Sequence, residues 1–234
     1  MKPVCLVTGV GPEHGTGAEI AKRFAKDYRV AMLARNAENV EKLAAQYENT
    51  YAYPCDVGDL DALKDTINKV KADLGEPKIV VHNALRSTRG PLLEQDPDDL
   101  ERNFRVNTTA LLHMARETIP GMLEMGGGSI LVTGNTSATR GKAQWGFFAS
   151  TKASQRILSE SIAREFGPQG IHVAYFVIDA AISTPRTRHL FGADRPDEYF
   201  AHGYAIAEEM FRVAHQDRST WSFLVELRPY GEVW

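Results

Sequence analysis

Short apolar runs alternate with longer amphipathic stretches along the whole chain. Runs such as "VCLVTG" at 4–9 and "SILVTG" at 129–134 are continuous and rich in β-branched residues, which is typical of strands buried on both faces of a sheet. Between them, apolar residues recur every three or four positions, as in helices that bury one face. The order predicts an α/β fold: a doubly wound, Rossmann-like parallel sheet with helices on both faces.

The pattern also places the individual elements. Pro54 favours an irregularity near the middle of the third strand, and Pro120 is expected to bend or end the fourth helix. The stretch 184–220 shows no strong pattern before its helical later half. About seven strands are expected, at 4–9, 29–35, 51–57, 78–84, 129–134, 171–179 and 221–227, and helices at 15–28, 37–47, 59–75, 96–125, 147–167 and 205–215.

Size and charge narrow the class of protein. A chain of 234 residues fits one domain, 1–234, and a net charge of −3 excludes a basic nucleic-acid footprint. The N-terminal apolar run is too short for a signal peptide or a membrane span. Cys5 and Cys55 lie in apolar surroundings, which favours buried thiols over a disulfide without excluding one. We expect a cytoplasmic protein without a metal, a membrane or a nucleic-acid partner.

Glycines follow the first expected strand in "TGVGPEHGTG". They permit a tight turn and a close approach of the backbone to a pyrophosphate, and the helix that follows offers free N–H groups at its start. The alternative is a merely flexible turn. The cofactor-binding candidates in this loop are Gly9, Gly11, Gly15, Thr16 and Gly17.

The ends of the second and third strands point to the nucleotide. Arg35 stands where a dinucleotide fold meets the adenosine ribose, and an arginine there suits a 2′-phosphate. No acid lies beside it, which favours NADP (NADPH) over NAD, although an ordinary surface arginine is the alternative. Asp56, followed by Val57, is expected to accept from the adenine amino group. Its alternative role is to cap the next helix, for which Asp59 is equally well placed.

With these features the chain resembles the short-chain dehydrogenase/reductase family over nearly its whole length. The resemblance rests on the glycine loop and on "CDV" (55–57), "HNA" (82–84), "VN" (106–107), "FASTK" (148–152) and "VIDAAISTP" (177–185). It implies that Asn83, Ala84 and Thr184 contact the cofactor and that Lys152 holds the nicotinamide ribose. It also implies a small-molecule substrate and a homodimer or homotetramer built through helices 96–125 and 148–166.

Several positions depart from the pattern of the family. The gap from Gly9 to Gly15 is two residues longer than usual, His82 replaces an asparagine, and Asp179 with Ala180 replaces Pro-Gly. Phe148 replaces the catalytic tyrosine, as in a sparsely characterised subgroup that the chain resembles. A phenyl ring cannot donate or accept a proton. Lys152 lies one helical turn later. It is expected either to bind the ribose, with no phenol whose pKa it could lower, or to extend past a core ring so that its ammonium reaches water.

Without the phenol, three groups of residues are candidates for protonating or stabilising a developing alkoxide. Lys152 is expected to deliver a proton through a water near Asn107. Asn135 or Ser137 is expected to stabilise the oxyanion, Ser137 by local pattern and Asn135 by distance from Phe148, unless both only satisfy backbone groups. Asp179 would act if burial raised its pKa, and otherwise caps a turn.

The function expected is NADP-dependent oxidation or reduction of a carbonyl or alcohol on a small, apolar substrate. The alternatives are a non-redox enzyme, such as a cyclase or isomerase, or a nucleotide-sensing protein. Residues 185–215 are expected to form a substrate lid, together with the loop 85–95. His82, Arg86 and Arg140 are further candidates for lining the cleft, with structural or surface roles as the alternative.

Overall fold

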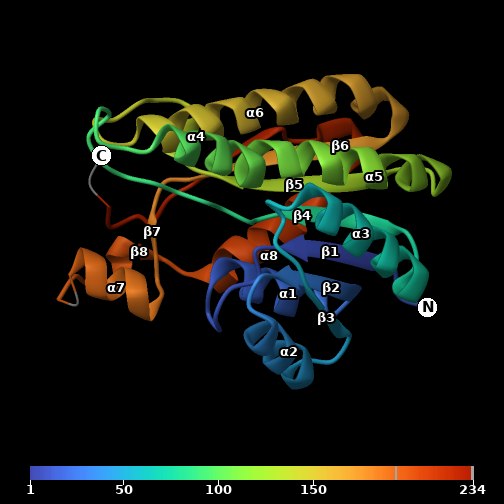
Figure 1. Ribbon diagram of the computed structural model, residues 1–234. Helices are drawn as coiled ribbons and strands as arrows, with labels where there is room; N and C mark the ends of the chain where they lie inside the picture. Colours follow the sequence, from blue (N-terminus) through green and yellow to red (C-terminus); the bar gives the residue numbers. More distant parts are fainter. Residues whose placement is uncertain (193, 233–234) are drawn as a thin grey trace.

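Seven parallel strands form the centre of the molecule, in the order β3-β2-β1-β4-β5-β6-β9 (Figure 1). The computed structural model describes residues 1–192 and 194–232. The central strands are β1 (Val4–Thr8), β2 (Arg29–Ala34), β3 (Thr50–Pro54), β4 (Pro77–His82), β5 (Gly128–Gly134), β6 (Ile171–Ile178) and β9 (Leu224–Leu227). The doubly wound α/β fold predicted from the alternating pattern is confirmed.

Helices cover both faces of the sheet. Neighbouring residues on β1 show the division, because Leu6 belongs to one apolar core and Val7 to the other, and both are fully buried. The core of Leu6 is closed by α3 (Leu60–Leu74), α5 (Ala110–Glu124) and α6 (Gly146–Phe166), and the core of Val7 by α1 (Thr16–Phe24), α2 (Ala37–Gln46) and α8 (Gly203–Ala214).

The connections of β1 place the functional site. β1 pairs with β2 on one side and with β4 on the other, so the chain order of the strands reverses at this point. The loops that leave β1 and β4 therefore turn toward opposite faces, and a crevice opens outside the carboxyl ends of these strands.

Pro54 does not lie in the middle of its strand, and Pro120 does not end its helix. Pro54 is the last residue of β3, where its missing N–H interrupts no pairing in the middle of the strand. Pro120 lies inside α5, which continues to Glu124. The expected helix 96–125 is instead divided by a π-helical turn, Arg105–Thr109, between α4 (Pro97–Phe104) and α5.

The segment without a strong pattern contains short elements. β7 (Ala181–Ile182) pairs with β8 (Phe200–Ala201) in a separate parallel pair, and α7 (Pro185–Phe191) lies between them. Elements of two to seven residues are too short to show periodicity. Part of the expected lid is core, because Ile206 and Met210 of α8 are buried against the sheet.

Neither cysteine is in a disulfide. Cys5 and Cys55 are buried free thiols, and burial raises the pKa of both. In the part of the chain that the structure describes, no helix combines the length and apolar character needed to span a membrane. The same residues contain no cluster of histidine, cysteine, aspartate and glutamate side chains suited to a metal ion.

Candidate active site

A cavity of about 830 Å³ lies in the crevice at the carboxyl ends of the central strands. Asn107 is buried behind its wall, and Ser137 and Thr184 are not among the described residues that line it. The cavity brings together most of the residues singled out in the sequence: Gly9, Gly11, Gly15, Thr16, Gly17, Arg35, Asp56, Val57, Asn83, Ala84, Asn135, Phe148 and Lys152.

Two glycines allow the backbone segments around the cavity to approach closely. Gly9 has a φ of 67°, and a Cβ atom on it would lie 2.5 Å from the Ala84 Cα atom. A Cβ atom on Gly17 would lie 2.4 Å from the Gly9 carbonyl oxygen. A Cβ on Gly11 would meet nothing within 4 Å, so this glycine is not required for packing. The extra loop residues turn back where the Gly15 N–H donates to the Pro12 carbonyl (2.9 Å).

The N-terminus of α1 opens into this cavity without a side-chain cap. The capping residue is Gly15, which has no side chain to accept a hydrogen bond from the first turn. The first N–H groups of a helix are unpaired within the helix and lie at the positive end of its dipole. Together with the two close-packed glycines, this arrangement fits a pyrophosphate group.

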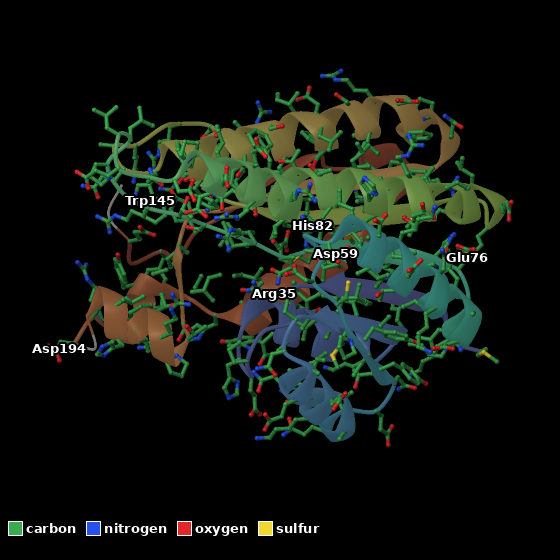
Figure 2. All side chains as sticks on the ribbon, viewed as in Figure 1. Arg35, Asp59, Glu76, His82, Trp145 and Asp194 are labelled. Carbon is green, nitrogen blue, oxygen red and sulfur yellow. The ribbon has the colours of Figure 1, made fainter. Side chains whose placement is uncertain are left out.

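Arg35 marks the outer end of the cavity. It lies exposed just after β2 (Figure 2), and its guanidinium makes no hydrogen bond or ion pair with any described residue. Asn36 next to it caps α2 by accepting from the Asn39 N–H (2.9 Å). The strand end therefore presents an unpaired positive charge beside a helix N-terminus.

The carboxylates after β3 have separate roles. Asp59 caps α3 by accepting from the Ala62 N–H (3.0 Å), which settles the choice of capping residue left open by the sequence. Asp56 accepts from the Gly58 N–H (2.9 Å) and lines the cavity.

Lys152 lies at the inner end of the cavity and does not reach bulk water. Its side chain is almost completely buried, at 3% exposure of the residue. The Nζ atom donates to the Thr133 carbonyl (2.9 Å) and to Gln155 Oε1. Burial lowers the pKa of Lys152 to about 7. The lysine therefore changes charge near neutral pH, in contact with the space that a ligand would fill.

Phe148 and Asn135 form part of the wall near Lys152. The Phe148 ring is buried and packs against Trp145, with 5.9 Å between ring centroids. Asn135 lines the cavity and accepts from the Ser137 N–H through Oδ1 (3.0 Å), while none of the described residues accepts from its Nδ2 atom. Of the two oxyanion candidates, Asn135 is the one at the cavity.

Asn107 makes hydrogen bonds to protein groups through both its side chain and its backbone carbonyl. Its Oδ1 accepts from the Arg86 N–H (2.9 Å), and its Nδ2 donates to the Arg86 carbonyl and the Thr151 hydroxyl (both 2.8 Å). Its backbone carbonyl accepts from His82 Nε2 (3.2 Å) and from Gln155 Nε2. The backbone carbonyl therefore has no lone pair left for a water, whereas Oδ1 keeps one, and the expected proton route through a water near Asn107 stays a prediction.

His82 is buried and neutral, and Asp179 is held in ion pairs. Burial, and then the charge of Lys152, lowers the pKa of His82 to about 4, so the ring is neutral. A carbonyl only accepts, so the proton sits on Nε2, facing Asn107, and Nδ1 faces the Thr8 hydroxyl (3.3 Å). Asp179 pairs with Arg228 (2.8 Å) and with Arg140 (3.9 Å), and its expected role as an acid stays a prediction.

Thr184 belongs to a second, smaller hollow of about 400 Å³, beside His14, Arg188 and His202. Its hydroxyl caps α7 by accepting from the Thr187 N–H (3.1 Å). The residue that the family resemblance assigned to the cofactor is therefore separated from the main cavity.

Gln155 and Tyr175 were missed in the sequence. Gln155 lies on the buried face of α6, one turn after Lys152, where a polar residue in an apolar pattern was the available signal. The single proton of the Tyr175 hydroxyl is shared between Gln155 Oε1 and the Lys152 carbonyl, both at 3.3 Å. The Tyr175 ring fills the space beside Gly134, where a Cβ atom would lie 2.2 Å from the ring.

Comparison with known proteins identifies the family. The short chain dehydrogenase family model matches residues 3–193. An uncharacterised short-chain type dehydrogenase/reductase of Sinorhizobium fredii is 30% identical over 176 residues, covering 72% of this chain and 70% of that protein. The D-threitol dehydrogenase of Mycolicibacterium smegmatis is 31% identical over 175 residues, covering 73% and 66%.

Solved structures share the fold over the full length. An alcohol dehydrogenase of the archaeon Thermococcus sibiricus, complexed with 5-hydroxy-NADP, superposes with a TM-score of 0.85 at 22% identity, covering 100% of this chain and 99% of that one. A metagenomic short-chain oxidoreductase in complex with NADP superposes with a TM-score of 0.83 at 22% identity, covering 98% of both chains. With its own glycine loop and buried Lys152, the chain belongs to the short-chain dehydrogenase/reductase family of oxidoreductases.

Proposed function

We propose that the protein is an NADP-dependent oxidoreductase that interconverts a carbonyl and an alcohol on a small, apolar substrate. One observation carries the proposal. A single cavity connects the unpaired guanidinium of Arg35, the uncapped start of α1 and the buried ammonium of Lys152. These are the groups needed for a 2′-phosphate, a pyrophosphate and a ribose, in that order along one dinucleotide.

The residues present fit this cofactor. The first N–H groups of α1 would hold the pyrophosphate, Arg35 the 2′-phosphate and Asp56 the adenine amino group. Lys152 would donate to the hydroxyls of the nicotinamide ribose. When bound, NADPH supplies the hydride of the reduction. Two solved structures with the same fold carry NADP or a derivative of it, which supports the choice.

The wall near Lys152 indicates the class of substrate. Leu85, Phe148, Ala180 and Ile182 line the cavity there, and their side chains are apolar. The Asn135 Nδ2 group is a donor for a substrate oxygen, where it would stabilise developing negative charge. Phe148 excludes water from this side but gives no proton, so the proton donor of this site is not a phenol at position 148.

The proposal is tested by titrating the purified protein with NADPH and, separately, NADH, while following cofactor fluorescence. We expect tight binding of NADPH and weak binding of NADH. A screen of small apolar aldehydes and ketones with deuterium-labelled NADPH then follows, with mass spectrometry of the alcohol. Deuterium on the former carbonyl carbon supports the proposal. Absence of binding by either cofactor would contradict it.

A second candidate is a nucleotide-binding protein without redox turnover. Phe148 favours this candidate, because the site has the groups that would hold a cofactor but lacks the phenol that the family uses as a proton donor. This candidate predicts saturable NADPH binding with no transfer of label to any carbonyl. The two parts of the experiment therefore separate the candidates.

A further inference from the structure

The side-chain amide of Gln155 joins two parts of the site that are far apart in the chain. Gln155 is completely buried on α6. Its Oε1 atom accepts from Lys152 Nζ and from the Tyr175 hydroxyl, and its Nε2 atom donates to the Asn107 carbonyl (2.5 Å). Three different elements supply its partners: α6 itself, the π-helical turn Arg105–Thr109 and β6.

The partners fix the orientation of the amide. Lys152 Nζ only donates and the Asn107 carbonyl only accepts. A flipped amide would place its N–H donors against the Lys152 donor and its oxygen against the Asn107 oxygen. The Asn107 carbonyl has two lone pairs, and the Nε2–H groups of His82 and Gln155 take both. A bridging water has no acceptor left at this carbonyl.

The same amide determines how the ammonium is held. An ammonium has three protons, and those of Lys152 that point into the protein go to the Thr133 carbonyl and to Gln155 Oε1. Both acceptors are uncharged, so they hold the nitrogen in place without the stabilisation that a carboxylate would give. The third proton remains for the cavity that Lys152 lines.

The titratable neighbours of Lys152 do not supply the negative charge that a carboxylate would. Among the described residues, His82 on β4 and Tyr175 on β6 are the titratable groups that the structure relates to this lysine. Burial keeps the His82 ring neutral and raises the pKa of the Tyr175 phenol. The charge state of Lys152 therefore depends on burial and on its two neutral acceptors.

We propose that Gln155 is a positioning residue, which holds Lys152 Nζ with one proton directed into the cavity and closes the Asn107 carbonyl to water. Lys152 then loses and regains its proton through the cavity alone. This step rests on the proposed function. In the reduction, the carbonyl carbon would gain the hydride of NADPH, leaving NADP⁺, and the oxygen would gain a proton that Nζ replaces by way of the ribose hydroxyl to which it donates. Water in the cavity returns a proton to the neutral amine.

The test measures the protonation of Lys152 directly in the cofactor-free protein. NMR of protein labelled with ¹³C and ¹⁵N in lysine follows the Lys152 signal with pH, and its loss in Lys152→Arg assigns it. Gln155→Glu places a carboxylate against the ammonium and should raise the pKa of Lys152 by about 1–3 units. Gln155→Met keeps the bulk but removes the acceptor, which should lower this pKa.

A matched control lies one turn further along the same helix. Ser159 is buried and donates to the Gln155 carbonyl but does not touch Lys152. Ser159→Ala should leave the titration of Lys152 unchanged. With NADPH and a substrate, the pH profile of kcat should shift with the Lys152 titration in Gln155→Glu, with a smaller effect on KM.

Unchanged Lys152 titration in both folded Gln155 variants would overturn the proposal. If neither variant folds, the wild type decides. The Gln155 side-chain amide protons should exchange slowly with solvent deuterium, and rapid exchange would show that water reaches the Asn107 carbonyl. A wild type that transfers no hydride would refute the proposed function, whereas the cofactor-free titration decides the role of Gln155 independently.

Discussion

Replacing Gly17 by alanine tests how the cofactor cavity is framed. The new Cβ atom would lie 2.4 Å from the Gly9 carbonyl oxygen and 2.8 Å from Asn83 Nδ2. An ordinary contact begins near 3.4 Å, so α1 must move away from the loop by about 1 Å. Overpacking of this kind lowers the free energy of unfolding by about 1–3 kcal/mol.

The same movement withdraws the first N–H groups of α1 from the pyrophosphate. One hydrogen bond to a charged group contributes about 1.5–3 kcal/mol, so losing one weakens NADPH binding about 10- to 100-fold. Fluorescence titration gives the dissociation constant, and urea unfolding gives the stability. Gly11→Ala is the control for stability, because its Cβ atom meets no protein atom within 4 Å, and its free energy of unfolding should match the wild type. Wild-type NADPH affinity in Gly17→Ala would refute this account of the loop.

Three further changes test other parts of the site. Arg35→Ser should weaken NADPH binding about 10- to 100-fold by removing a charged partner of the 2′-phosphate, and leave NADH binding unchanged; an equal loss for both cofactors in fluorescence titrations would contradict this. Phe148→Tyr should raise the carbonyl reduction rate by up to about 10²–10⁴-fold, because it adds a proton donor one turn before Lys152; an unchanged or lower rate would mean that the proton does not pass position 148. His82 has a folded-state pKa of about 4 against an ordinary value of 6.5, so the unfolded chain binds more protons between these pH values. The wild type should therefore lose stability as pH falls from 6.5 to 4, and His82→Asn should lose less in urea unfolding; equal losses would show that His82 is not responsible.

Much of the fold follows from local pattern. The continuous apolar strands and the amphipathic helices between them carry the doubly wound topology, and Gly75, a predicted helix end, closes α3 with a φ of 97°. The short elements around residues 181–201 have no such signal. Their position depends on contacts such as the pairing of Ala181 with Phe200, across residues that the pattern leaves undefined.

The site divides in a similar way. Residues at strand ends, such as Arg35 and Asp56, were predictable because parallel strands deliver their carboxyl ends to one edge of the sheet. The choice between Asn135 and Ser137 was not, because it depends on how the short turn after β5 directs each side chain. Gln155 was missed because its partners on other elements become neighbours only in the folded chain.

The packing of Tyr175 against Gly134 couples the residue types that evolution can place at two positions on neighbouring strands. The ring occupies the volume of the side chain that Gly134 lacks, and its hydroxyl contacts the amide beside Lys152. A larger residue at 134 is compatible only with a smaller one at 175, which would also remove that hydroxyl. Related sequences should therefore change these two positions together, and a double-mutant cycle on them should show strong non-additivity. Sequence change at positions 134 and 175 is therefore expected to occur as paired substitutions.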